Sequence, residues 1–125
     1  MKLKTVILED SLVAKISLEN FCKNYPFIEF IDSYETAAEA IEYLKENKVD
    51  LIFLDVELKD GLGWKILDLL DSDTTVVLTT SHEKYFDEAK KSINIKHFML
   101  KPIYLDKFLM IMSQLEKGGK NWSAN

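Results

Sequence analysis

Short apolar runs alternate with segments of helical spacing along most of the chain. Apolar runs of about four to eight residues bounded by polar ones are typical of buried strands. Apolar residues three and four positions apart instead indicate a helix with one buried face. The runs that predict strands are residues 5–8, 27–31, 49–54, 75–79 and 97–100. Strands that alternate with helices in this way predict a parallel sheet covered by helices on both faces.

The segments between the apolar runs predict five helices. They are a helix capped by Asp10 or Ser11, a helix opened by residues 33–36, a short helix bearing Trp64, Ile66, Leu67 and Leu70, and helices over 83–91 and 104–115. We therefore expect an α/β fold, a single doubly wound sheet of five parallel strands with five helices.

Chain length and composition predict a single domain. A chain of 125 residues that is 47% hydrophobic can bury one continuous core. We expect this domain to span residues 1–117. The polar residues 118–125, with Gly118-Gly119 ending the last helix and Trp122 beyond it, form a tail or the start of a linker to an output domain.

Charge and cysteine content exclude several classes of protein. The net charge of -5 argues against direct nucleic-acid binding, which usually requires a clustered basic surface. Cys22 is the single cysteine, so it cannot form an internal disulfide, and the chain begins with a short charged segment. We expect a cytoplasmic protein. No apolar run approaches the roughly 20 residues that cross a bilayer, so we expect no membrane insertion.

Chemically active side chains follow four of the five predicted strands. Ligands of an open α/β sheet bind beyond the carboxyl ends of the strands, where the strand order reverses. If the strand order is 2-1-3-4-5, these four strands are neighbours and their side chains converge on one crevice. The residues are Glu9 and Asp10 after the first strand, Asp55 after the third, Thr79, Thr80 and Ser81 at the end of the fourth, and Lys101 after the fifth.

This combination predicts a magnesium-dependent phosphoryl site. Three carboxylates packed together repel one another unless a cation lies among them. All the offered ligands are oxygen atoms, which favours Mg²⁺. The ion also neutralises phosphoryl oxygens, while Lys101 can pair with another oxygen and a threonine hydroxyl can donate to a third. Asp55 would be the nucleophile that becomes an aspartyl phosphate.

Each of these residues also has an ordinary structural interpretation. A loop rich in Asp and Gly after a strand is often only a turn, and Glu9 and Asp10 could merely cap a helix. Thr79 and Thr80 could be β-branched residues that fill a strand. His82 and His97 have no metal-binding neighbours in the sequence, although His82 is close enough to the site to influence hydrolysis. The combination of all four segments favours a functional site.

Four segments together resemble the receiver domains of bacterial two-component response regulators. They are Glu9-Asp10, Asp55-Val56-Glu57-Leu58 with Gly63 eight residues after Asp55, Thr79-Thr80-Ser81, and Lys101-Pro102. The resemblance spans roughly residues 3–116. Residues 79–85 and 98–103 are most similar to receivers that precede LytTR-type DNA-binding domains. The resemblance implies a flavodoxin-like fold with the strand order 2-1-3-4-5.

The resemblance also implies a role for each matching residue. Asp55 would be the phosphoacceptor, with Mg²⁺ bound directly by Asp10, through water by Glu9, and by the backbone carbonyl of Glu57. Thr80, before the small Ser81, would be the switch hydroxyl in preference to Thr79. Lys101 would pair with the phosphoryl group, and Lys101-Pro102 would be a cis peptide.

The sequence departs from the usual receiver pattern in three places. Lys59 stands where many receivers have a proline, four residues after the phosphoacceptor. Phe98 occupies the switch aromatic position, three residues before the lysine, and cannot donate a hydroxyl hydrogen bond. The segment between Asp55 and the threonine pair is also shorter than usual, which predicts a trimmed third helix.

As a receiver, the chain would be a signalling domain that assists its own phosphorylation and dephosphorylation, and not an enzyme for a separate substrate. A sensor histidine kinase would donate phosphoryl to Asp55, Thr80 would move towards it, and Phe98 would follow inward. The face formed by residues 83–91, 97–100 and 104–115 would then contact an output domain or form a homodimer. We expect such an output domain to bind DNA. The apolar run Phe108, Leu109, Ile111 and Met112 predicts this interface, with Phe108 as a contact residue.

Two other functions fit parts of the pattern. A haloacid-dehalogenase-like phosphohydrolase would also use Mg²⁺ and an aspartyl phosphate, but it typically has an aspartate two residues after the nucleophile, where this chain has Glu57. It would also need a substrate cap, for which 125 residues leave little room. The other alternative is a receiver-like scaffold that is never phosphorylated.

Overall fold

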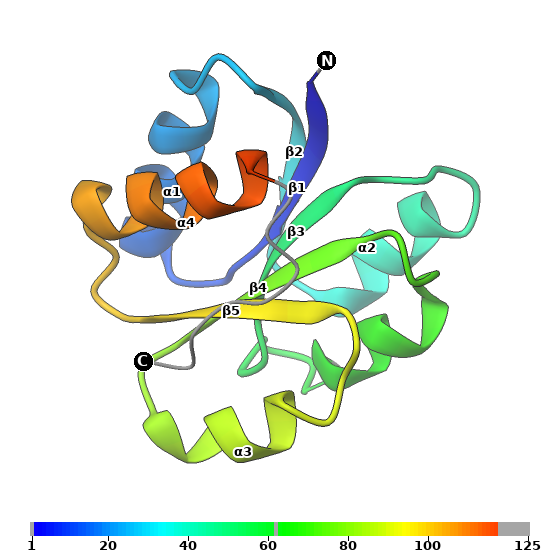
Figure 1. Ribbon diagram of the computed structural model, residues 1–125. Helices are drawn as coiled ribbons and strands as arrows, with labels where there is room; N and C mark the ends of the chain where they lie inside the picture. Colours follow the sequence, from blue (N-terminus) through cyan, green and yellow to red (C-terminus); the bar gives the residue numbers. More distant parts are fainter. Residues whose placement is uncertain (1, 62, 118–125) are drawn as a thin grey trace.

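Strands and helices alternate throughout the part of the chain that the computed structural model describes, residues 2–61 and 63–117 (Figure 1). The strands there are β1 (Leu3–Leu8), β2 (Ile28–Tyr34), β3 (Leu51–Asp55), β4 (Thr75–Thr80) and β5 (Ile95–Leu100). The α-helices are α1 (Leu12–Lys23), α2 (Ala37–Leu44), α3 (Phe86–Ala89) and α4 (Leu105–Glu116). Two 3-10 helices, η1 (Gly63–Leu69) and η2 (Glu83–Tyr85), complete the set, and η2 runs directly into α3.

The strands form one parallel sheet in the order β2-β1-β3-β4-β5. The predicted doubly wound α/β fold and its strand order are therefore confirmed. The strand order reverses between β1 and β3, and the carboxyl ends of these two strands mark the crevice where such folds bind ligands.

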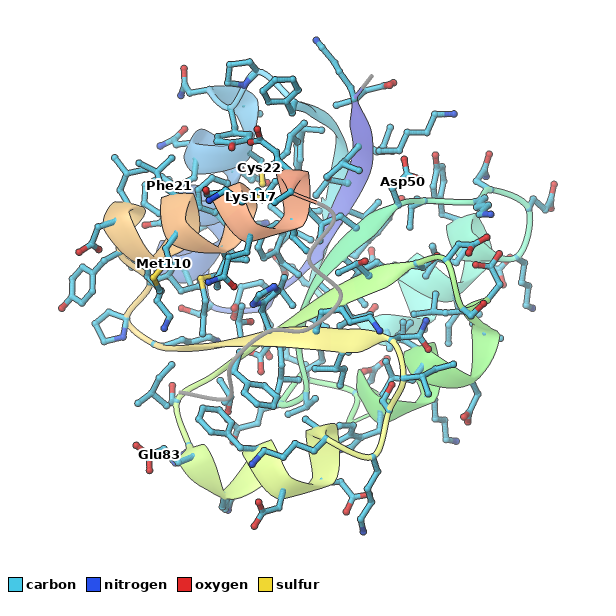
Figure 2. The ribbon with its side chains drawn as sticks, in the orientation of Figure 1. Phe21, Cys22, Asp50, Glu83, Met110 and Lys117 are labelled. Carbon is cyan, nitrogen blue, oxygen red and sulfur yellow. The ribbon has the colours of Figure 1, made fainter. Side chains whose placement is uncertain are left out.

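The two faces of the sheet bury separate apolar clusters. Helices α1 and α4 cover one face, and α2, η1 and α3 cover the other (Figure 1). Every residue of the central strand β3 is buried, as expected for a strand covered on both sides. Cys22 is fully buried on the α1 and α4 side, where it packs as a small apolar residue (Figure 2).

Phe108 lies in the core, and its prediction as a surface contact is wrong. Its side chain has no exposed area and packs against Phe53 of β3, with the ring centroids 5.8 Å apart. Phe21 and Tyr25 enclose the same ring from the α1 side, at centroid distances of 5.4 and 5.9 Å. The apolar run on α4 is wide because aromatic residues from two elements surround it. The apolar residues that α4 exposes are Leu105, Leu109 and Met110.

Several predicted boundaries shift because strand pairing overrides local composition. Strand β2 continues to Tyr34, since Ser33 and Tyr34 pair with Ile7 and Leu8 of β1. The prediction that residues 33–36 open a helix is therefore wrong, and α2 begins after its N-cap, Thr36. The helix predicted over 83–91 consists of η2 followed by the single turn of α3.

The trimmed third helix is a seven-residue 3-10 helix, η1. The expectations for Gly118-Gly119, Trp122 and a tail over 118–125 concern residues outside the described part of the chain. Within the described part, every helix is too short or too polar to span a bilayer.

Candidate functional site

Glu9, Asp55 and Lys101 meet at the carboxyl edge of the sheet. In Figure 2, Asp50 marks the edge of the sheet where β3 begins, and Glu83, shortly after β4, marks the opposite, carboxyl edge. At the latter edge, the Lys101 ammonium donates to Asp55 Oδ2 and to Glu9 Oε2, both at 2.8 Å. The side chains of Glu9 and Asp55 are 0% and 3% exposed, and that of Lys101 is 15% exposed. The sequence prediction that these three groups converge is confirmed.

Asp10 adds a third carboxylate to this cluster. Glu9, Asp10 and Asp55 each offer an oxygen within 4.8 Å of the others. Oε1 of Glu9 is buried and has no hydrogen-bond partner within the described residues. Buried polar atoms normally have a partner, which can be an ion or a water molecule. Three carboxylates with one unpartnered oxygen are a donor set that fits a hard divalent cation such as Mg²⁺.

Burial and their mutual contacts shift the pKa values of Glu9 and Lys101. Burial raises the pKa of Glu9 to about 7, and the negative charge of Asp55 adds to this effect, against the opposing influence of Lys101 and the Ser11 backbone N–H. Burial would lower the pKa of Lys101, but its hydrogen bonds to Asp55 and Glu9 outweigh burial, so that pKa is raised. The Lys101 ammonium thus contacts two of the three carboxyl groups, and a cation would lower the mutual repulsion of all three.

The backbone at the ends of β1 and β3 orients the two buried carboxylates. The Ser11 N–H donates to Glu9 Oε2 at 3.0 Å, and the Glu57 N–H donates to Asp55 Oδ1 at 2.8 Å. Ser11 is the N-cap of α1, although its own side chain makes no capping hydrogen bond. The carboxylate of Glu9 is thus held by the start of the helix and by Lys101. Lys101-Pro102 is a cis peptide, as the sequence predicted.

The Glu57 carboxylate joins the loop after β3 to the loop after β4. It accepts hydrogen bonds from the hydroxyls of Thr80 and Tyr85, both at 3.4 Å, and lies 3.7 Å from Nε2 of His82. The sequence predicted a role only for the Glu57 carbonyl, and the contacts of the Glu57 carboxylate were not predicted. The available signal was that Glu57 and His82 each lie just past the end of neighbouring strands.

Thr79 and Thr80 have different surroundings. Thr80 Oγ1 accepts from the His82 N–H at 3.1 Å besides donating to Glu57. Thr79 pairs with Asp55 in the sheet, and its buried hydroxyl has no partner within the described residues. Only Thr80, therefore, is connected to the Glu57 group.

The ring of Phe98 is already packed inside the molecule. It is 7% exposed and stacks on Phe86 of α3 with centroids 4.5 Å apart and an interplanar angle of 8°. Beside it, an open groove of about 530 Å³ is lined by Phe86, Phe98, Leu100, Pro102 and Tyr104, among other residues. Any movement of Phe98 must therefore start from a buried, stacked position.

The fold and this cluster together define a receiver, and comparison with known proteins agrees. The sequence model of the response regulator receiver domain matches residues 5–113, so the chain belongs to this family. LytT, a sensory transduction protein of Bacillus anthracis, is 25% identical over 118 residues, which are 92% of this chain and 48% of LytT. CitT, a transcriptional regulatory protein of Bacillus subtilis, is 28% identical over 117 residues, 90% of this chain and 51% of CitT.

Solved structures support the same fold. The response regulatory domain of mrkE from Klebsiella pneumoniae is 22% identical, with a TM-score of 0.80 over 94% of this chain and 98% of that one. A CheY-like receiver from Methylobacillus flagellatus is 17% identical, with a TM-score of 0.73 over 92% of this chain and 99% of that one. The chain spans about half the length of the curated relatives it matches. The predicted similarity to LytTR-type regulators is confirmed by these relatives.

Proposed function

We propose that this receiver accepts a phosphoryl group on Asp55 from a sensor histidine kinase in a Mg²⁺-dependent reaction. The observation that carries the proposal is the Lys101 ammonium, which lies 2.8 Å from both Asp55 and Glu9 in a cluster with an unpartnered Glu9 oxygen. Mg²⁺ would be held by Asp10, Asp55 and the Glu57 carbonyl, and through water by Glu9. When bound, the ion would neutralise phosphoryl oxygens during transfer.

The residues of the chain would divide the chemistry between them. A carboxylate oxygen of Asp55 forms the new bond to phosphorus, while the bond between phosphorus and the donor histidine nitrogen breaks and the nitrogen keeps the electron pair. Lys101 then exchanges its contact with the Asp55 carboxylate for one with a phosphoryl oxygen. The Glu57 N–H holds the other Asp55 oxygen and so fixes the orientation of the nucleophile.

Phosphorylation would change the partner of Thr80. A phosphoryl group adds a charge of about -1.5 to -2 and strong acceptor oxygens. Thr80, whose hydroxyl bonds to Glu57 at 3.4 Å in the unphosphorylated chain, would donate to this group instead. Because Glu57 also holds Tyr85, the exchange would loosen η2 and, through α3, the stack of Phe86 on Phe98.

The surface that would respond is formed by η2, α3, β5 and α4. Its exposed apolar residues include Leu100, Tyr104, Leu105 and Leu109, which are 42 to 62% exposed. This surface would contact an output domain or form a homodimer. Since CitT is a transcriptional regulatory protein about twice as long as this chain, a DNA-binding output in the cytoplasm is the expected reader.

The test is intact-mass spectrometry after incubation with acetyl phosphate, with and without Mg²⁺. We expect one phosphoryl adduct on the wild type, only when Mg²⁺ is present, and no adduct on Asp55→Asn. The matched control is Asp87→Asn, since that side chain is 99% exposed and should leave labelling unchanged. An unlabelled wild type, beside a second receiver that is labelled, would favour the non-phosphorylated scaffold.

A further inference from the structure

Asp60 fastens the loop after β3 to the beginning of α2. Its Oδ1 accepts the Ala37 N–H at 3.3 Å, and its Oδ2 accepts the Ala38 N–H at 3.1 Å. These residues are more than 20 positions from Asp60 in the sequence. A negative charge at this end of a helix is favourable because it faces unpaired N–H groups and the positive end of the helix dipole.

The contact completes the N-terminus of α2 in a way that the local sequence cannot. Thr36, the N-cap, accepts the Glu39 N–H at 3.3 Å, as a threonine at this position commonly does. The Ala37 and Ala38 N–H groups point to Asp60 instead. The first turn of α2 thus depends on two caps, one from its own segment and one from the loop that follows β3.

A buried side chain, a tight turn and a close backbone approach constrain the described residues on either side of Asp60. Leu58 is 3% exposed, and its carbonyl accepts the Gly61 N–H at 2.8 Å in a turn that gives Gly61 a φ of +70°. A Cβ atom on Gly63 would lie 2.8 Å from the Val56 Cα atom, so this end of the loop tolerates only glycine. Lys59 is a weaker anchor, because its side chain is 65% exposed and its ammonium lies as far as 4.0 Å from the Glu35 carboxylate.

We propose that Asp60 is a positioning residue for the Asp55 site. By fastening the loop to α2, its carboxylate keeps the Glu57 carbonyl and N–H in place for the metal and for Asp55. This inference rests on the proposed function, because it assumes that the loop contributes to Mg²⁺ binding. Without the Asp60 contact the loop would occupy the binding arrangement for only part of the time, and apparent affinity falls by that fraction.

The first measurement is the Mg²⁺ affinity of the 125-residue chain by isothermal titration calorimetry. We expect Asp60→Ala to bind Mg²⁺ about fivefold more weakly than the wild type, and Asp60→Asn, which keeps one acceptor oxygen, to lie between them. Where Asp60→Ala does not fold, the comparison of Asp60→Asn with the wild type decides alone. Unchanged affinity in a folded Asp60 variant would overturn the proposal.

The matched control is Thr36→Ala, which removes the other cap of α2 and leaves the loop intact. It should lower the melting temperature by a few degrees without changing Mg²⁺ affinity. Equal loss of affinity in Thr36→Ala would show that Asp60 acts only through helix stability.

Hydrogen exchange without metal separates this inference from the proposed function. The Glu57 and Gly61 N–H groups should exchange several-fold faster in Asp60→Ala than in Thr36→Ala. If the wild type binds no Mg²⁺, the proposed function fails, whereas equal exchange in both variants refutes the fastening of the loop itself.

Discussion

Replacing Glu9 with glutamine should flatten the dependence of metal-free stability on pH. The Glu9 carboxyl has its pKa raised from 4.5 to about 7 in the folded chain, chiefly by burial. Between these pH values the folded chain holds a proton that the unfolded chain releases. The free energy of unfolding therefore falls as pH rises through this range, and the loss is complete above about pH 7.

The size of the effect follows from the pKa difference. A shift from 4.5 to about 7 corresponds to roughly 3 to 4 kcal/mol, at about 1.4 kcal/mol per pKa unit. That amount is a large share of the 5 to 15 kcal/mol that typically separates folded from unfolded domains, as an order of magnitude. Saturating Mg²⁺ should restore much of it, since binding to the folded chain at about 100 times Kd contributes about 2.7 kcal/mol.

The assay is urea unfolding of wild type and Glu9→Gln between about pH 5 and about pH 8.5 in the presence of a chelator. The stability of the variant must be subtracted from that of the wild type at each pH, because His97 changes stability with pH in the direction opposite to Glu9. Burial lowers the pKa of His97 from 6.5 to about 4, so its contribution is lost as pH falls through that range. His97 is common to both proteins and cancels.

The stability difference, wild type minus Glu9→Gln, should become more negative by about 3 kcal/mol as pH rises from about 5 to about 8. Adding Mg²⁺ should shrink this change in the wild type and have a smaller effect on the variant. A difference that does not vary with pH would refute the assignment of a raised pKa to Glu9.

Three further predictions, made with four substitutions, test other parts of the structure. Phe108→Ala should lower the free energy of unfolding by about 3 to 5 kcal/mol, whereas Leu109→Ala, at a 42% exposed position, should cost less than about 1 kcal/mol in urea unfolding. Lys101→Met leaves two buried carboxylates without their ammonium, so it should lower the free energy of unfolding by about 3 to 5 kcal/mol in the presence of a chelator. Mg²⁺ should restore part of this stability, and the variant should be labelled slowly by acetyl phosphate. Glu57→Ala should speed hydrogen exchange at the N–H of His82, which bonds to Thr80, while lowering the free energy of unfolding by no more than about 1 kcal/mol. Unchanged exchange would show that Glu57 does not hold the loop after β4.

The strands and the residues of the main cluster could be predicted because both depend on features that are local in the sequence, whereas the strand order came from the resemblance to receiver domains. Each buried strand is a short apolar run, and Glu9, Asp55 and Lys101 come directly after three of them. Once the strands are parallel neighbours, their carboxyl ends meet at one edge, and the convergence of these side chains follows.

The errors arose where tertiary contacts decide the outcome. Asp32, Ser33 and Tyr34 do not read as a strand, yet pairing with β1 extends β2 through them. The apolar run around Phe108 was assigned to a surface because sequence periodicity does not reveal that Phe21 of α1 and Tyr25, just after α1, enclose that ring. Pairing and enclosure depend on residues distant in the chain, which a local pattern does not contain.

The missed carboxylate has a similar explanation. Glu57 could be assigned a position relative to Asp55, but the direction of its side chain depends on where the loop after β4 lies. The anchor at Asp60 was likewise hidden, because the two N–H groups that it accepts belong to a helix that precedes β3 by several residues.

Because of the contacts of Lys101, the site is assembled only when the fold is complete. Its two carboxylate partners lie 92 and 46 positions earlier in the chain, so the cluster is spread over nearly the whole domain. During synthesis, Glu9 and Asp55 emerge long before the lysine that pairs with them. A nascent or partly unfolded chain therefore lacks an assembled site, and on the proposed function only a molecule whose last strand has docked could receive a signal.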